Sequence, residues 1–450
     1  MPKKIIINKF GGGIMVREFI PLIKKHLREQ LAAGYRPIAV VSALKGITDE
    51  ILLFLSELEK HTLSAANRKI KLFVKNLFEK HLSLMADIGV SAIWRKQIKS
   101  EFKKIFFELE NDLVAFSFSG QSPALRAKLS AYGEKFSAIL MAGYFNSSGL
   151  AAKEFLAEEI PIITDDNFLD ADIKYKISEK NIRKKLLTLS ELPVIAGFTG
   201  KTAKGQTTVL GRGGTDTTAC FTAAALRADK VILWKDVSGV LSADPKIVPE
   251  AKTIPFISYQ EAEESGKVIQ EKAIQYVKLF KTPAEIVSLA NPNCKTRIGA
   301  IGQLKKGSKI VSFKKNLTLF IITEEIIKMN DLLSLVCQTF SKYKVDIILI
   351  SNARYILQIV VNNGNGLVNK VFRELKNKVS EIKIFNVSMV FLVGSFDVND
   401  VNDFNHLLIK HKTGLEISAF FYENCARIEA IVKTNKIESV IKVLYKKFIR

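Results

Sequence analysis

The stretch Lys4-Ile-Ile-Ile-Asn-Lys-Phe-Gly-Gly-Gly13 decides how this chain is expected to fold. Its first half is an apolar run typical of a buried strand, and residues 14–33 follow with apolar side chains near the 3.6-residue period of a helix. A strand that passes through a glycine loop into a helix is the opening unit of a parallel α/β sheet. Such a loop brings backbone N–H groups to phosphate oxygens, and Lys9 beside it would neutralise their charge. A glycine-rich tight turn explains the same residues about equally well.

A second glycine-rich segment, Gly211-Arg-Gly-Gly-Thr-Asp-Thr-Thr-Ala219, also follows an apolar run and opens a helix. Arg212 offers a planar fork that matches a carboxylate. Asp216 falls in the first helical turn, where it could hold a lysine. Ordinary helix capping by Thr and Asp is the alternative. Capping alone does not explain why Arg, two Gly and Asp stand together.

A third segment, residues 233–246, begins at the end of an apolar strand and continues as a loop rich in Gly, Asp and Lys. Its composition suits contacts with an adenine or a ribose. Taken by itself, a plain surface hairpin is somewhat the better explanation.

Short apolar runs and helical patterns alternate through the first two thirds of the chain. This alternation predicts an α/β fold with a mainly parallel sheet covered by helices on both faces, which binds ligands at the carboxyl ends of its strands. Near residues 300–316 Gly and Lys increase and the alternation stops, which indicates a domain boundary. The last third follows the order βαββαβ of a ferredoxin-like unit and then begins a similar pattern again. The predicted domains are a catalytic domain at 1–300 and two small domains at 316–386 and 387–450. The prediction includes an arrangement in which the strands of the two small domains interleave.

The composition of the chain disfavours several classes of function. The net charge is +22, from 67 Lys and Arg against 45 Asp and Glu, but the lysines are spread along the chain and no nucleic-acid-binding motif accompanies them. We therefore expect no nucleic-acid partner. No apolar run is long enough to span a bilayer and the N-terminus does not resemble an export signal, so we expect a cytoplasmic protein without a membrane partner. The five histidines leave residues 82–405 without one, and the four cysteines form no C-x-x-C pair, which disfavours histidine catalysis and structural zinc.

Four segments together resemble the aspartate kinase family of the amino-acid kinase superfamily. They are V-V-S-A-L-K-G-I-T-D-E (40–50), G-E-K-F-S (133–137), V-L-G-R-G-G-T-D-T-T-A (209–219) and D-V-S-G-V-L-S-A-D-P-K-I-V-P-E-A (236–251). The resemblance runs from Lys9 to about Pro292, and the tail resembles the tandem ACT domains of that family.

The resemblance implies an ATP-dependent enzyme that phosphorylates the side-chain carboxylate of L-aspartate to 4-phospho-L-aspartate. That reaction is the first step of the lysine, threonine and methionine (diaminopimelate) pathway. It also implies Mg²⁺ held chiefly by phosphates and water, with no protein ligand assigned, and a homodimer or higher homo-oligomer formed through the ACT-like domains. The matching positions are Lys9 and Asp216 for catalysis; Ser42, Thr48, Glu134, Phe198, Arg212 and Thr215 for aspartate; and Lys9, Gly11, Gly12, Gly213, Gly214, Lys235, Asp236, Lys246 and Lys267 for the nucleotide.

The chain departs from the family pattern at several positions. The family loop is K-F-G-G-T-S, whereas this chain has Gly13 and Ile14 in place of the two hydroxyl residues. Where the family has His-Pro-Arg, this chain has Gln-Glu-Lys at 270–272. These departures keep open a second reading, a degenerate kinase homologue of low or no activity that binds ligands for regulation. Another amino-acid kinase, acting on glutamate or N-acetylglutamate, is disfavoured by the R-G-G-T-D motif and the tail. The position of an aspartate in lysine-sensitive relatives is Ile348, which predicts weak or absent inhibition by lysine.

Overall fold

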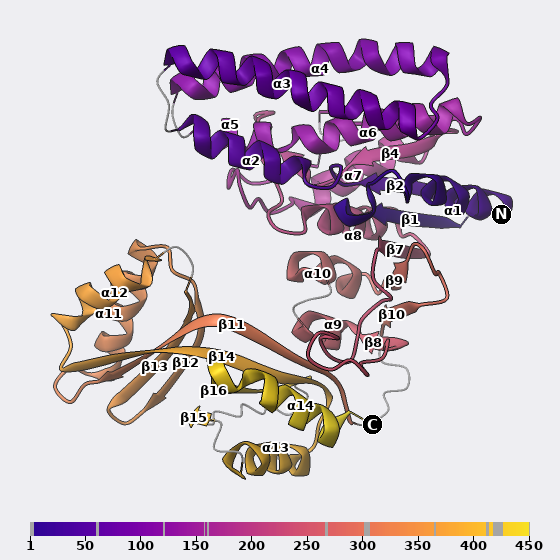
Figure 1. Ribbon diagram of the computed structural model, residues 1–450. Coiled ribbons are helices and arrows are strands. Elements are labelled where there is room, and N and C mark those ends of the chain that lie inside the picture. The colour runs from indigo at the N-terminus through magenta and orange to yellow at the C-terminus, as the bar shows by residue number, and fades with distance from the viewer. Residues whose placement is uncertain are drawn as a thin grey trace. The chain divides into compact units, whose positions relative to one another are not determined.

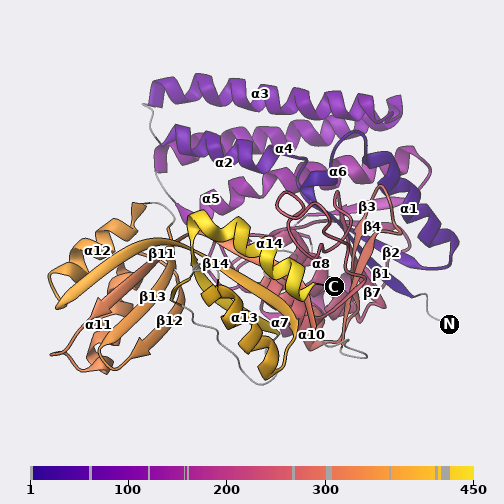
Figure 2. The same ribbon diagram turned by 60° about the horizontal axis from the view of Figure 1, so that its bottom comes forward.

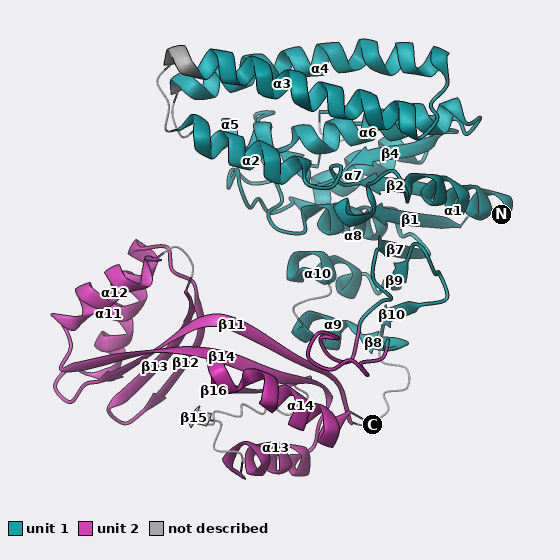
Figure 3. Cartoon of the chain, in the orientation of Figure 1, with its two compact units in different colours: residues 1–240, 253–302 teal, residues 241–252, 303–450 magenta. Residues whose placement is uncertain are grey.

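A computed structural model describes the chain as two compact units (Figure 3). The first consists of residues 1–240 and 253–302, and the second of residues 241–252 and 303–450. The residues described are 4–59, 63–119, 122–156, 158–159, 162–265, 269–300, 307–363, 366–410, 414–416 and 426–449.

The first unit is built on an eight-stranded sheet in the order β3-β4-β2-β1-β7-β9-β10-β8. Neighbouring strands are parallel except β9 and β10, which are antiparallel. This arrangement confirms the predicted mainly parallel sheet. The strands are β1 (Ile5–Phe10), β2 (Arg36–Val41), β3 (Ala152–Phe155), β4 (Leu192–Ala196), β7 (Lys230–Lys235), β8 (Phe256–Ser258), β9 (Ala284–Ser288) and β10 (Lys295–Gly299), with a separate hairpin of β5 (Thr199–Lys201) and β6 (Thr207–Val209).

Helices cover both faces of this sheet. On one face lies α6, with the long antiparallel pair α3 and α4 outside it, and on the other lies α8 with α7 and α10 beside it (Figures 1 and 2). Both α6 and α8 are buried over nearly their whole length, as central layers of a sandwich must be. The helices are α1 (Ile20–Ala32), α2 (Ile47–Leu58), α3 (Leu63–Asp87), α4 (Ala92–Ser119), α5 (Pro123–Ser130), α6 (Tyr132–Ser147), α7 (Tyr175–Leu186), α8 (Gly214–Leu226), α9 (Tyr259–Ser265) and α10 (Glu271–Leu279).

The helix predicted from residue 14 begins six residues later. Gly12–Ile14 forms a separate 3₁₀ turn, η1, and α1 starts at Ile20 with Pro21 in its first turn. The first turn of a helix favours proline, because the fixed φ of proline suits a helix and a backbone N–H at this position would have no partner within the helix.

His81 on α3 lies fully buried among aromatic rings of the first unit. Its Nδ1 is 2.7 Å from the Leu77 carbonyl oxygen, its Nε2 has no hydrogen-bond partner among the described residues, and the rings of Phe102 and Phe136 approach it edge-on at 5.7 and 5.0 Å. Burial lowers the pKa of His81 to about 4. The site is therefore built for a neutral imidazole.

Acid should destabilise the protein through this histidine. The unfolded chain, with a pKa near 6.5, binds a proton that folded His81 refuses until about pH 4, so stability falls as pH drops through that window. The loss amounts to about 3 kcal/mol at pH 4. We expect His81→Phe to remove this loss, measured by chemical unfolding at pH 7 and pH 4, whereas His406→Gln, at an exposed histidine, should leave it in place. An equal loss in wild type and His81→Phe would contradict the assignment.

The second unit is built on a six-stranded antiparallel sheet in the order β12-β13-β11-β14-β16-β15. Its two central strands, β11 and β14, are 17 and 15 residues long and pair with each other through both halves of the unit. The predicted boundary at 386/387 therefore falls inside a continuous strand. The strands are β11 (Gly307–Thr323), β12 (Ile347–Ala353), β13 (Ile356–Asn362), β14 (Glu381–Ser395), β15 (Gly414–Glu416) and β16 (Arg427–Lys433).

Two helices pack on each half of this sheet. The pair α11 (Met329–Lys342) and α12 (Val368–Lys376) encloses one apolar core, and α13 (Val398–Lys410) and α14 (Ile437–Phe448) enclose another. The second core also takes in Ala243, Ile247 and Val248. Residues 241–252 therefore belong to this unit, although the sequence alone assigned them to the first domain. Of the strand predicted at 415–421, the part after residue 416 lies outside the described residues.

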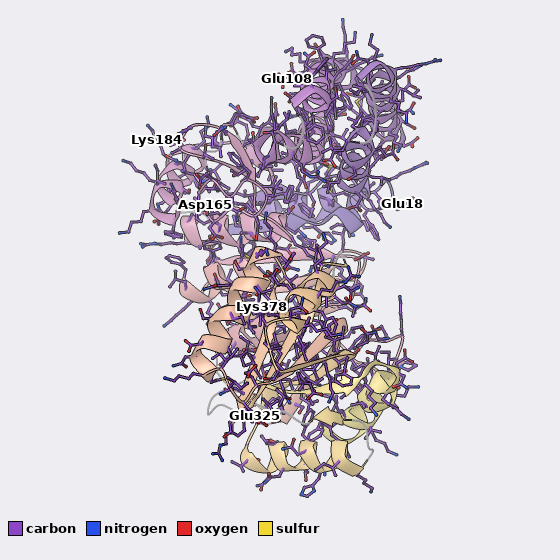
Figure 4. The ribbon with its side chains drawn as sticks, turned by 90° about the vertical axis from the view of Figure 1, so that its left-hand side faces the viewer. Glu18, Glu108, Asp165, Lys184, Glu325 and Lys378 are labelled. Atoms are coloured by element: carbon purple, nitrogen blue, oxygen red, sulfur yellow. The ribbon has the colours of Figure 1, made fainter. Side chains whose placement is uncertain are left out.

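Charged side chains lie on the outside of the first unit. Glu18, Glu108 and Lys184 are exposed and project from its periphery (Figure 4). Among the described residues, no helix is both long enough and apolar enough to cross a membrane.

Candidate active site

Four strands of the first unit end at one edge of the sheet. β4, β2, β1 and β7 are consecutive and parallel, so the loops that follow them lie along the same edge. Ligands of open α/β sheets bind at this edge. The predicted site residues of the first unit come largely from these loops and from the first turns of α6 and α8.

Lys9, Asp216 and Lys235 form the charged centre of the site. Lys9 is the next-to-last residue of β1, and its Nζ lies 2.7 Å from Asp216 Oδ1. Lys235 is the last residue of β7, and its Nζ lies 4.0 Å from Asp216 Oδ2. Burial would raise the pKa of Asp216, but the two lysines outweigh it and the pKa is lowered. Burial lowers the pKa of Lys235, which Asp216 partly opposes. One carboxylate thus holds two ammonium groups, and the cluster carries a net positive charge suited to phosphate.

The glycine loop leaves room for charged side chains. A Cβ added to Gly11 would lie 2.8 Å from Lys9 Nζ, so only glycine allows that ammonium to lie across the loop. A Cβ added to Gly13 would lie 3.1 Å from an oxygen of Asp236. Where the family carries a hydroxyl residue, this chain therefore has Gly13 with the Asp236 carboxylate beside it.

Hydroxyl groups gather beside this centre. Ser42, directly after β2, lies 3.1 Å by its Oγ from Thr215 Oγ1 in the first turn of α8. Thr48 in the first turn of α2 lies next to Gly133, because a Cβ on that glycine would be 3.4 Å from Thr48 Oγ1. The structure therefore connects the loop after β2 both to α8 and to the start of α6.

Glu134, in the first turn of α6, is a buried carboxyl group that has no ion-pair partner among the residues the structure describes. It is 3% exposed, its Oε2 has no hydrogen-bond partner among the described residues, and it accepts a hydrogen bond from the Ala43 backbone. Burial raises its pKa to about 8. An unpaired buried carboxyl group is costly in an empty site and would be well matched by an ammonium group.

Phe198 and Arg212 complete the predicted amino-acid pocket. Phe198 follows β4 and has φ of 69°, a left-handed conformation that is strained for an aromatic residue. Arg212 is exposed in the loop between β6 and α8, one residue before Gly213, which caps α8.

Two predicted nucleotide residues do not belong to the described part of the first unit. Lys246 lies in the second unit, and Lys267 lies outside the described residues.

Residues 270–272, Gln-Glu-Lys, at which the chain departs from the family pattern, make contacts that the sequence did not predict. Gln270 packs on Gly213, whose added Cβ would fall 2.2 Å from Gln270 Cγ. Lys272 Nζ lies 2.7 Å from Asp170 Oδ1 and 2.9 Å from Asp172 Oδ1. The segment therefore connects the start of α10 to the loop before α8 and to the segment before α7. The signal available in advance was the acidic run 165–172 opposite a new lysine, but no sequence pattern links the two.

Known proteins resemble this chain in sequence. Aspartokinase of Rickettsia prowazekii is 28% identical over 298 residues, which cover 64% of this chain and 53% of that protein. Chloroplastic aspartokinase 2 of Arabidopsis thaliana is 24% identical over 475 residues, covering 98% and 84%. The chain spans between about half and two thirds of the length of the first curated relatives it matches.

Solved structures share the fold. Escherichia coli aspartokinase III, in complex with aspartate and ADP, matches with a TM-score of 0.80 at 21% identity, over 98% of this chain and 99% of that one. The aspartate kinase of Clostridium acetobutylicum matches with a TM-score of 0.76 at 23% identity, over 99% and 100%. The sequence profile of the amino acid kinase family matches residues 4–288, which include the glycine loop, Glu134 and the whole of α8. The chain belongs to the amino acid kinase family.

Proposed function

We propose that this protein is an aspartate kinase, which transfers the γ-phosphoryl group of ATP to the side-chain carboxylate of L-aspartate. The observation that carries the proposal is the Lys9–Asp216–Lys235 cluster at the glycine loop, on the same sheet edge as the unpaired carboxyl group of Glu134. The first suits a transferring phosphoryl group and the second suits an amino-acid ammonium. The aspartate and ADP bound to the related E. coli enzyme support the same pairing of substrates.

The chemistry asks little of the protein beyond placement and charge. The nucleophile is a carboxylate that is already ionised at neutral pH, so no general base is needed. Lys9 would neutralise charge that develops on the phosphoryl group, and Asp216 holds that ammonium in place. Arg212 would bind the α-carboxylate of aspartate and Glu134 its ammonium group. Positioning of the two reactants then accounts for most of the acceleration.

The described residues fit a Mg²⁺ ion held mainly by the nucleotide. They contain no group of three or more Asp, Glu, His or Cys side chains that could hold a metal ion. Asp216 is committed to Lys9, which leaves Asp236, exposed and beside Gly13, as the carboxylate that would reach a phosphate-bound Mg²⁺. Such an ion would supply charge neutralisation at the phosphates.

A hydroxylamine trap tests the function. We expect ATP-dependent hydroxamate from L-aspartate, and none from L-glutamate or N-acetylglutamate. Nucleotide binding without hydroxamate from any of them would favour the degenerate regulatory homologue, for which the loss of both loop hydroxyls at Gly13 and Ile14 is the specific observation.

We further propose that the two halves of the second unit are ACT domains that pair two copies of the chain. The edge strand β12 exposes Ile350, the turn after it exposes Tyr355, and the first residue of β13, Ile356, is exposed as well, which suits addition of a second copy along that edge. Light scattering should then report a dimer or a larger oligomer. We assign the enzyme to the cytoplasm and to the first step of the lysine, threonine and methionine pathway.

Lysine should not inhibit this enzyme. Ile348, at the position of the aspartate in lysine-sensitive relatives, packs with the apolar cluster that contains Leu319, Val360 and Met389. An ammonium group placed there would lose its hydration without gaining a counter-charge. We expect an unchanged initial rate across a lysine titration, with Ile348→Asp as the variant most apt to gain sensitivity. Inhibition of the wild type by micromolar lysine would refute this expectation.

A further inference from the structure

The backbone of Phe198 is held in its strained conformation from both sides. Its φ of 69° is left-handed, a region that a bulky L-residue adopts only when its surroundings impose it. The Phe198 carbonyl oxygen accepts a hydrogen bond from Leu210 N–H at 2.9 Å, and its N–H donates to Thr218 Oγ1 at 3.0 Å. The strain is therefore fixed by two bonds, one of which comes from a side chain.

Thr218 uses its single hydroxyl twice. Besides accepting from Phe198, the hydroxyl donates to the Gly214 carbonyl oxygen at 3.0 Å, and the residue is fully buried in α8. It thus joins the residue after β4 to the first turn of the helix that carries Thr215 and Asp216.

The Phe198 side chain contacts the start of α8 and an apolar cluster that includes the residue before α6. A Cβ added to Gly214 would fall 2.7 Å from Phe198 Cδ2, so the ring lies on the first residue of α8. Phe198 also packs against the apolar cluster of Ala127, Ala131 and Val209, and Ala131 directly precedes α6, which carries Glu134. A change in the Phe198 backbone would therefore shift a ring that packs on the first residue of α8 and on the cluster beside the start of α6.

We infer that Thr218 is a positioning residue for the amino-acid pocket: its hydroxyl fixes the left-handed Phe198 backbone and thereby the ring that closes the pocket between α8 and α6. Thr218 touches neither reactant in this assignment. The inference rests on the proposed function, since it assumes that the pocket beside Phe198 takes the amino-acid substrate.

Thr218→Val removes the hydroxyl while keeping the shape of the side chain. We expect it to raise the KM for aspartate roughly three- to tenfold, which is the effect of one lost hydrogen bond, with the KM for ATP unchanged. Thr218→Ser should restore the wild-type value. Thr222→Val is the matched control, because Thr222 is buried one turn later in α8 and its hydroxyl donates to a backbone group of the same helix, the Thr218 carbonyl oxygen. Its KM values should match the wild type.

Hydrogen exchange gives a readout that needs no turnover. The Phe198 amide should exchange roughly tenfold faster in Thr218→Val than in wild type or Thr222→Val. If Thr218→Val does not fold, Thr218→Ala replaces it in both measurements. An unchanged exchange rate in the Thr218 variant, or an equal rise of the aspartate KM in the Thr222 variant, would overturn the inference. A wild type that forms no hydroxamate would instead overturn the proposed function, and the exchange measurement would still decide the role of Thr218.

Discussion

Replacing Lys9 with methionine should lower kcat for hydroxamate formation about a thousandfold, because one preorganised charge at a developing oxyanion is worth that much in a water-poor site. Lys9 is only 8% exposed and its Nζ is held at 2.7 Å from Asp216. Methionine keeps the length of the side chain and removes the charge. Rates at saturating ATP and aspartate measure the effect.

Lys4→Met is the matched control for that experiment, since Lys4 directly precedes β1 and is exposed. It should retain the wild-type rate. Nucleotide binding by Lys9→Met, followed by fluorescence, separates a lost catalytic charge from a lost site. A Lys9→Met rate within tenfold of the wild type would remove Lys9 from the mechanism.

Glu134→Gln should weaken aspartate binding roughly a hundredfold while making the empty protein more stable at alkaline pH. Both effects follow from one fact: the Glu134 carboxyl group is buried, and the described part of the chain offers it no partner cation. An ammonium group bound opposite glutamine would be desolvated without a counter-charge, which accounts for the weaker binding. The neutral amide also removes the cost of ionising a buried group.

The sign of the pH dependence follows from the raised pKa of Glu134, about 8 when folded and 4.5 as the ordinary value. The folded protein keeps a proton that the unfolded chain has lost, so stability is full below pH 4.5 and falls as pH rises to 8. The loss is roughly 5 kcal/mol at pH 8 and above. Unfolding of wild type and Glu134→Gln at pH 5 and pH 8.5 should show a gap only at the higher pH.

Ligand binding should reverse this protonation. Below pH 8, an ammonium ligand would displace the proton from Glu134, so calorimetry in two buffers of different ionisation enthalpy should detect proton release. Glu79→Gln, at an exposed acid of α3, is the control and should change none of these quantities. A Glu134→Gln variant with wild-type aspartate affinity would show that this carboxyl group does not receive the substrate.

The parallel sheet was predictable because several of its strands are continuous apolar runs, as Leu192–Ala196 shows. The sharing of β11 and β14 was not, because a strand that continues through a presumed linker has the same alternation as two separate strands. Likewise, α1 was predicted too long because apolar residues in an irregular segment happened to fit the helical period.

For the site, local motifs located Lys9, Asp216 and Glu134, whose positions depend on the first turn after a strand or at a helix start. Contacts between distant segments could not be derived from one sequence. The packing of Gln270 on Gly213 and the bond from Phe198 to Thr218 depend on side-chain rotamers and on a strained φ, neither of which leaves a pattern in the residues.

The membership of residues 241–252 in the second unit means that the polypeptide passes between the units three times, after Val240, Lys252 and Gly302. A truncated gene ending near codon 302 would delete α13 and α14 but leave Ala243, Ile247 and Val248 behind, stripped of the core that encloses them. Such a product should expose these apolar side chains and aggregate, unless residues 241–252 are deleted as well. Residues 241–252 continue directly from Asp236–Val240, the segment proposed to face the nucleotide. A displacement of residues 241–252 would therefore be transmitted to that segment through the covalent backbone.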